Sequence, residues 1–131
     1  MAAIDEHQKL VNALVIRFVN DGLEIENADL EGYEEPYKIG RHEPDIIARN
    51  VSEDLVVIGE AKNCADLTSD RSREQFQDFS NAAMREGKSQ GHSVPFYIVV
   101  QKNCASHAAS VLAQLNVNNK PNVTLLQYGI E

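Results

Sequence analysis

The 131-residue sequence contains no tryptophan and has only two cysteines, four prolines and seven glycines. With 43% hydrophobic and 24% charged residues, this composition excludes a low-complexity or disordered chain. We expect one globular domain over residues 1–131. Two cysteines are too few for a disulfide framework, so we expect reduced thiols and a cytoplasmic protein. No apolar run approaches the roughly 18 residues of a membrane span and no signal-like segment begins the chain, which disfavours membrane insertion and secretion.

Basic residues are also scarce, because 12 lysines and arginines stand against 20 acidic residues, a formal charge of -8. A protein that binds nucleic acid usually offers a basic face, so any DNA-binding role must depend on local charge. Acidic residues are concentrated in 21–35, whereas several basic residues lie close to two acidic motifs. These basic residues are Lys38, Arg41, Lys62, Arg71, Arg73, Arg85 and Lys88.

The first half of the chain predicts one helix and three strands. Apolar residues recur at helical spacing from Ile4 to Phe18, and Gly22 is expected to end this helix. The strands are expected at 23–30, 45–48 and 55–62. The polar segment 31–43 is expected to be a loop, and a hairpin-type turn at 50–54 predicts that the last two of these strands are antiparallel.

The second half predicts two further helices and two further strands. Ser69 and Asp70 can cap a helix that Gly87 stops, with Phe76, Phe79 and Ala83 on its apolar face. The remaining elements are a strand over 96–100, a helix capped by Asn103 and a strand over 123–126. A helical connection makes the strands at 55–62 and 96–100 parallel neighbours. The predicted fold class is therefore α/β, with the order αβββαβαβ and helices on both sides of a mixed sheet.

The third strand carries the pattern that points to chemistry. Period-two alternation places Glu60 and Lys62 on one face where the apolar strand ends, and small Gly59 on the other face lets a helix pack closely behind. Asp45 begins the neighbouring antiparallel strand, so its carboxylate is expected to converge with that of Glu60. Two carboxylates and the carbonyl of Ala61 suit Mg²⁺ or Mn²⁺. Lys62 could orient or deprotonate the attacking water, or stabilise negative charge on the phosphorane. This predicts phosphodiester hydrolysis; a solvated ion pair between Glu60 and Lys62 is the alternative.

Pro-Asp at 44–45 and Glu-Ala-Lys at 60–62 resemble the signature of the PD-(D/E)xK nuclease superfamily, which has the restriction-endonuclease-like fold. The resemblance covers about residues 1–102, and Arg-Glu-Gln at 73–75 is similar to the glutamine-bearing helix of archaeal Holliday junction resolvases. It implies an αβββαβ core, followed here by a further helix and strand, and a metal-dependent DNA endonuclease. The implied site consists of Asp45 and Glu60 as metal ligands, Lys62 as the catalytic lysine and Gln75 as an auxiliary catalytic residue.

The sequence departs from the resolvases on its first helix, where they carry a further metal-binding glutamate. Val11 and Asn12 occupy that place here. Glu6 lies more than a turn earlier and could serve as a ligand if the helix is displaced. The alternative is that Glu6 is a solvated acid that complements the helix dipole.

Basic and histidine side chains near the site could contact substrate phosphates. The candidates are Arg41, His42, Arg71, Arg73 and Lys102. Alternatively, Arg71 and Arg73 could pair with Glu74 and Asp78, and His42 could be a solvated loop residue.

The tetrapeptide Lys-Asn-Cys-Ala occurs at 62–65 and again at 102–105, each time after an apolar strand. Adjacent parallel strands would bring Cys64 and Cys104 close, as a redox-sensitive pair or a soft metal site. Two thiols without a histidine make a poor zinc site, and we favour coincidence.

The function we expect is that of a Mg²⁺- or Mn²⁺-dependent DNA endonuclease in recombination or repair, acting as a homodimer. A chain this small has little room for a base-reading domain, which favours branched or nicked DNA as substrate. The acidic charge opposes counterion-release binding, so a protein partner could supply affinity. No residue of the sequence is expected to exclude the 2′-hydroxyl group, so RNA is a further possible substrate of the same site. The main alternative is a non-catalytic acidic interaction protein or assembly subunit on the same fold.

Overall fold

The computed structural model describes residues 5–129 of the chain, so the predicted helical position Ile4 lies outside the described residues. The helices and strands follow each other in the order that periodicity predicts. They are α1 (Glu6–Asn20), β1 (Glu24–Ala28), β2 (Ile46–Asn50), β3 (Leu55–Lys62), α2 (Asp70–Ser80), β4 (Phe96–Gln101), α3 (Ala105–Gln114) and β5 (Val123–Tyr128). No helix within residues 5–129 is both long and apolar enough to cross a membrane.

The five strands form one mixed sheet in the order β1-β2-β3-β4-β5. The first three strands pair antiparallel, and β3, β4 and β5 pair parallel, as the helical connections require. The register places Ile46 opposite Gly59, and Lys62 opposite Val100. The start of β2 and the ends of β3 and β4 therefore lie along the same edge of the sheet.

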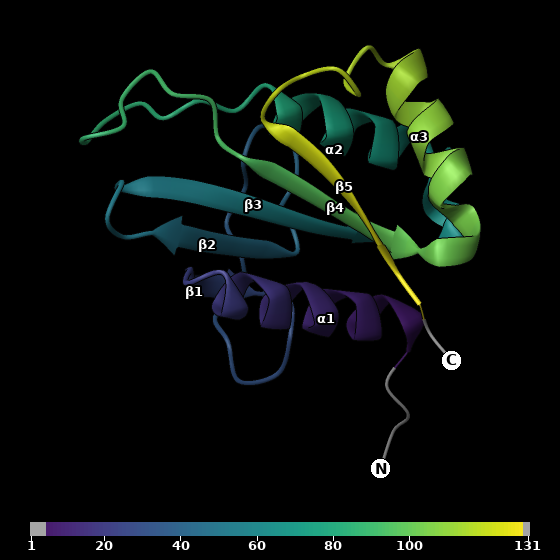
Figure 1. Cartoon of the computed structure of the whole chain (residues 1–131), viewed down its shortest axis with the longest axis horizontal. Coiled ribbons are helices and arrows are strands. Elements are labelled where there is room, and N and C mark those ends of the chain that lie inside the picture. The colour runs from purple at the N-terminus through teal and green to yellow at the C-terminus, as the bar shows by residue number, and fades with distance from the viewer. Residues whose placement is uncertain (1–4, 130–131) are drawn as a thin grey trace.

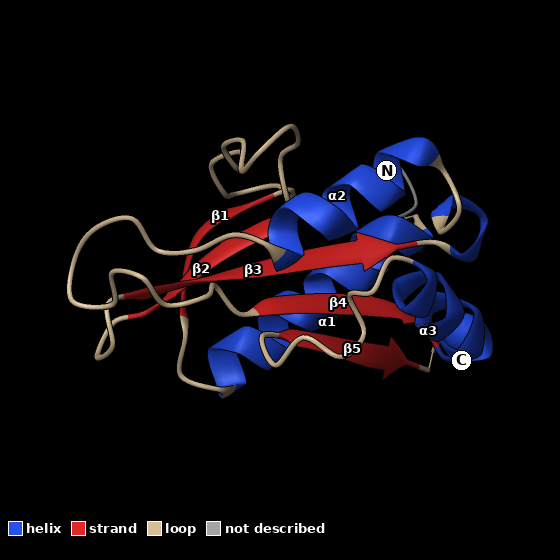
Figure 2. Cartoon of the chain, turned by 90° about the horizontal axis from the view of Figure 1, so that it is seen from above, coloured by secondary structure: helices blue, strands red, loops and turns tan. Residues whose placement is uncertain are grey.

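Helices cover both faces of the sheet, and the α/β class with a mixed sheet is confirmed. Figure 1 shows α1 beneath the sheet and α2 and α3 above it, and Figure 2 looks onto the face that α2 covers. Two hydrophobic clusters result, one between α1 and the sheet and one between the sheet and α2 with α3. Val57 and Ala61 belong to the first cluster, and Val56 and Ile58 to the second, as alternation predicts.

Gly59 allows α1 to approach β3 closely. A Cβ atom built on Gly59 would lie 2.8 Å from Leu14 Cδ2 and 3.0 Å from Phe18 Cε2. Both helix residues are buried and pack directly on the backbone of β3. The expected close packing behind this strand is confirmed.

The second helix is shorter than predicted, because α2 ends at Ser80 and does not reach Gly87. A further helical turn would need the amide of Met84 to donate to the carbonyl of Ser80. Instead, the side chain of Asn122 donates to this carbonyl at 3.0 Å, and the amide of Met84 donates to the carbonyl of His92. Tertiary hydrogen bonds thus end the helix, and Ala83, predicted on its face, forms a β-bridge with Ser93.

The cap predicted for α3 is wrong by one residue. Residues 102–104 form a 3₁₀ turn, so Cys104 and not Asn103 precedes α3, and it makes no side-chain capping hydrogen bond. The expectation of reduced thiols is also wrong, because a disulfide joins Cys64 to Cys104 with their Cα atoms 5.8 Å apart. The parallel pairing of β3 and β4 brings both cysteine-containing segments to the same edge of the sheet.

Candidate active site

Asp45 and Glu60 meet where β2 begins and β3 ends. The amide of Asp45 donates to Glu60 Oε1 at 3.0 Å, and the amide of Ala61 donates to Asp45 Oδ2 at 2.8 Å. Antiparallel pairing of β2 with β3 makes this reciprocal contact possible, because residue 46 lies opposite residue 59. Each carboxylate is therefore oriented by the backbone beside the other, and both line a cavity of about 310 Å³.

Glu60 is a buried acid, with a side chain only 2% exposed. Burial raises its pKa well above the usual value, and the nearby charge of Asp45 raises it further. The ammonium of Lys62 opposes both effects, because its Nζ lies 3.2 Å from Glu60 Oε2. Two carboxylates and one ammonium thus share the buried end of the site.

Lys62 is also held from the other side of the cavity by Gln75. Its ammonium donates a hydrogen bond to Gln75 Oε1, and both side chains are buried. Ser69 caps the helix that carries Gln75 by accepting from the amide of Ser72 at 3.1 Å. Phe76 next to Gln75 packs in the core, so α2 presents the glutamine to the end of β3. The structure brings together the predicted residues Asp45, Glu60, Lys62 and Gln75.

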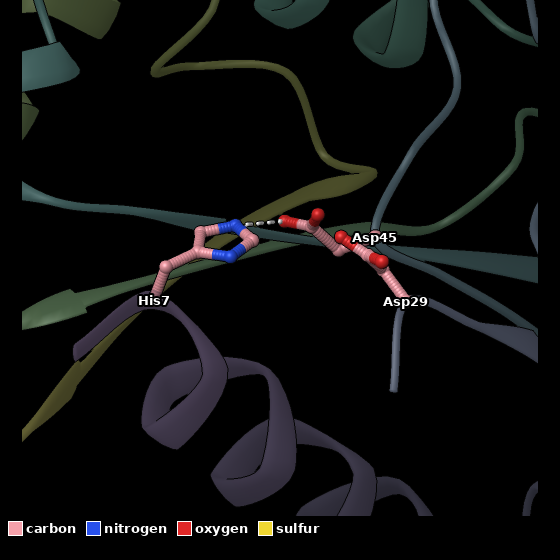
Figure 3. Close-up of side chains that lie close together, drawn as sticks. All are labelled: His7, Asp29 and Asp45. Carbon is pink, nitrogen blue, oxygen red and sulfur yellow. Dashed lines mark hydrogen bonds and ion pairs between the residues drawn. The ribbon is translucent and has the colours of Figure 1, made fainter. Parts of the chain in front are cut away.

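The sequence analysis missed His7, which projects from the first turn of α1 toward Asp45. His7 Nε2 lies 3.1 Å from Asp45 Oδ2, and this hydrogen bond raises the pKa of His7. Figure 3 shows the imidazole directed at the Asp45 carboxylate, with Asp29 beside it. Ligand atoms of His7, Asp29 and Asp45 lie within 4.8 Å of one another, close enough to hold a metal ion.

Helical periodicity could have predicted that His7 faces the sheet. Leu10 and Val11, which are buried under the sheet, follow His7 by three and four residues and so share its face of α1. Glu6 lies one residue away, is exposed and does not line the cavity. The structure therefore brings His7, and not the expected Glu6, to the site.

Two of the expected phosphate-binding residues contact acidic side chains of α2. Arg41 Nη2 lies 3.0 Å from Asp78 Oδ1, and His42 Nε2 lies 2.8 Å from Glu74 Oε1. The guanidinium hydrogen bond from Arg41 lowers the pKa of Asp78. These contacts fasten the loop that precedes Asp45 to α2.

Of the other expected phosphate-binding residues, only Arg71 lies at the cavity. Arg71, in the first turn of α2, lines the cavity. Arg73 lies on the same helix and Lys102 follows β4, but neither lines the cavity. In the described part of the chain, neither Arg71 nor Arg73 forms an ion pair with Glu74 or Asp78. The side chains of these two acids contact Arg41 and His42 instead.

The cavity holds more acidic than basic groups. Its ionisable lining consists of Asp29, Glu35, Glu43, Asp45, Glu60, His7, Lys62 and Arg71. Five acidic side chains against one lysine and one arginine make a site that favours divalent cations. Comparison of the chain with protein-family models, with curated proteins and with solved structures finds no match.

Proposed function

We propose that this protein is a Mg²⁺- or Mn²⁺-dependent DNA endonuclease with the restriction-endonuclease-like fold of the PD-(D/E)xK superfamily. The observation that carries the proposal is the reciprocal contact of Asp45 and Glu60, with Lys62 paired to Glu60 at the same cavity. A solvated ion pair at a sheet end does not account for this arrangement, because all three residues are buried. Buried charge concentrated in a cleft is typical of functional sites.

The donor set fits a divalent cation. Asp45 and Glu60 supply carboxylate oxygens, and the carbonyl of Ala61 can supply a third. Asp45 also belongs to the group with His7 and Asp29 whose ligand atoms lie within 4.8 Å of one another. The raised pKa of Glu60 reflects burial and an excess of negative charge that such a cation would relieve. An imidazole ligand is better suited to Mn²⁺ than to Mg²⁺. When bound, the cation supplies polarisation of a phosphoryl oxygen and a lower pKa for the attacking water.

Lys62 has a defined role in this proposal. Its ammonium has three N–H donors, of which one is directed to Glu60 and one to Gln75. The third donor is left for the substrate, where it stabilises the negative charge that develops on the phosphate. Gln75 is a positioning residue, because its amide oxygen holds the ammonium in place.

The expected homodimer, the preference for branched or nicked DNA and a partner that adds affinity stay predictions. The alternative, a non-catalytic acidic interaction protein or assembly subunit, is favoured by the three exposed carboxylates Asp29, Glu35 and Glu43 around the cavity. That alternative predicts binding to basic proteins that does not depend on Asp45 or Lys62.

Cleavage of supercoiled plasmid, single-stranded DNA and a four-way junction in Mg²⁺ and in Mn²⁺ tests the proposal. Lys62→Met and Asp45→Asn should each lower the cleavage rate by about 100-fold or more. Glu53→Gln, in the β2–β3 turn at the far end of the sheet, is the matched control and should cut at the wild-type rate. Wild-type protein that cuts nothing, or site variants that cut as fast as the control, would show that this cavity is not a nuclease site.

A further inference from the structure

The two edges of the sheet differ in how they are protected. At one edge, β1 carries Glu24 and Glu26, its pairing with β2 contains an irregularity, and the amide of Ala28 donates to the carbonyl of Glu34 in the following loop. Charged side chains, bulges and covering loops keep an edge strand from pairing with another chain. At the other edge, β5 has the sequence Val-Thr-Leu-Leu-Gln-Tyr, without charge or proline, and an unbroken register with β4. The β5 edge therefore lacks these protections.

The outer side of β5 presents main-chain groups without a strand partner. The amide of Phe96 donates to the carbonyl of Asn122, so the main-chain groups of residue 122 and of every second residue after it point to β4. Those of Leu125 and Gln127 point outward. Within residues 5–129 no strand pairs with this side, and Figure 2 shows β5 at the border of the sheet with β4 on its inner side.

The chain around β5 is also nearly free of charge. The protein carries a formal charge of -8, yet residues 87–129 contain no aspartate or glutamate. Histidine aside, residues 103–129 contain a single charged residue, Lys120, whose ammonium donates to the side chain of Asn81. Depletion of charged residues distinguishes the centre of a protein interface from the rest of a surface. This is the part of the protein where two acidic copies can meet without placing carboxylates against each other.

Exposed apolar side chains lie beside the β5 edge, on the face of the sheet that α1 covers. Ile16 on α1 is 52% exposed and Tyr128 at the end of β5 is 39% exposed. The two residues line one shallow groove of about 240 Å³. Leu126 points to the same face, because it packs against the cluster beneath α1. An apolar flank thus accompanies the unpaired main-chain groups.

We propose that two copies of this chain associate through β5, which pairs antiparallel with β5 of the second copy across a two-fold axis. The proposal goes beyond the nuclease function and does not depend on it. A second copy is the occupant that fits, because an uncharged edge offers nothing to select a partner of opposite charge, whereas two-fold symmetry makes a strand complementary to itself. The result is one continuous sheet through both copies.

The outward groups determine the register. Leu125 lies opposite Gln127 of the second copy and Gln127 opposite its Leu125, and each pair exchanges both N–H···O bonds. The axis then passes between the two copies of Leu126, whose side chains meet as a closely spaced pair. On the same face, each Tyr128 lies opposite Thr124 of the second copy. The exposed ring of Tyr128 is thereby covered.

Sedimentation equilibrium from about 1 µM to 1 mM chain tests the association. The apparent mass should rise from 14.6 kDa toward twice that value. Amide hydrogen exchange locates the surface, because the amides of Leu125 and Gln127 should become protected as the chain concentration rises. Since the contact is uncharged and the net charges of the copies repel, added salt should not weaken the dimer.

Gln127→Pro removes the outward N–H of residue 127 while leaving every bond to β4 in place. Symmetry removes this donor twice, so the dissociation constant should rise at least about ten-fold. Gln127→Ala keeps the amide and is the matched control. Ile16→Glu, which charges the apolar flank, should weaken association several-fold, whereas Val51→Glu, at a 61% exposed position in the β2–β3 turn, should not.

Each result supports or overturns the proposal. Thermal melts show whether each variant is folded, and if Gln127→Pro does not fold, Ile16→Glu against Val51→Glu decides. A chain that stays monomeric up to 1 mM overturns the proposal. A dimer that Gln127→Pro or Ile16→Glu leaves as tight as its control, or one that forms without protecting the amides of Leu125 and Gln127, shows that another surface joins the copies.

Discussion

Replacing Gly59 with alanine tests whether the close approach of α1 to β3 is essential to the fold. The residue lies within β3, opposite Ile46 on one neighbouring strand and Tyr97 on the other. An added methyl group would lie 2.8 Å from Leu14 Cδ2 and 3.0 Å from Phe18 Cε2. Both side chains are at most 1% exposed, so neither can move aside into solvent.

Two opposing effects determine the free energy of unfolding of Gly59→Ala. Alanine restricts the unfolded chain more than glycine does, which stabilises the fold by about 0.4–1 kcal/mol. Forcing a methyl group into a well-packed core costs about 1–3 kcal/mol. The overpacking term wins, and we expect a net loss of about 1–2 kcal/mol, which lowers the melting temperature by about 3–8 °C.

Urea unfolding of single and double variants measures this loss. Leu14→Ala alone should cost about 2–5 kcal/mol, because it leaves a cavity under the sheet. In the double variant, the new methyl group can occupy part of that cavity, so the combined cost should fall short of the sum by about 1 kcal/mol.

The control pairs Gly59→Ala with Val111→Ala, which lies in the cluster on the opposite face of the sheet. These two changes should add within about 0.5 kcal/mol. A Gly59→Ala protein as stable as the wild type would refute the packing argument, as would strict additivity with Leu14→Ala.

Three further predictions concern the site and the disulfide. Mn²⁺ at about 100 times its dissociation constant should stabilise the fold by about 2.7 kcal/mol in thermal melts, and a full shift retained in Asp45→Asn would place the ion elsewhere. Burial raises the pKa of Glu60, so above pH 4.5 the folded protein keeps a proton on this carboxyl that the unfolded chain has lost. The free energy of unfolding should therefore fall as the pH rises above 4.5. If Glu60→Gln showed the same dependence of stability on pH as the wild type, this explanation would be wrong. Reduction of the bridge between Cys64 and Cys104, separated by 40 residues, should lower stability by up to about 4 kcal/mol, whereas Cys104→Ser should melt identically with and without reductant.

Several features of the candidate site could be predicted from local patterns. Alternation along β3 gives Glu60 and Lys62 a common face, and a hairpin-type turn before this strand brings Asp45 next to them. These patterns involve neighbours in sequence or one short turn. Helical spacing could also have predicted where His7 lies, since the buried residues Leu10 and Val11 follow it on the same face of α1.

Other features depend on contacts between distant segments. The Arg41–Asp78 and His42–Glu74 pairs join residues more than 30 positions apart, and nothing in the local sequence selects one acid over another. These pairs engage two groups that the sequence assigned to substrate. Asp29 similarly acquires its role only because β1 pairs with β2 and its amide donates to the carbonyl of Asp45.

The sequence by itself determined the order of the helices and strands, the mixed sheet and the convergence of Asp45 with Glu60, because each follows from periodicity or from a short connection. Only the tertiary structure decided where α2 ends, since the side chain of Asn122, 42 residues away, donates a hydrogen bond to the carbonyl of Ser80. It also decided that Cys64 and Cys104 are joined, because parallel pairing sets the distance between them. Local periodicity depends on the backbone repeat of a single segment, whereas these outcomes depend on which segments pack together.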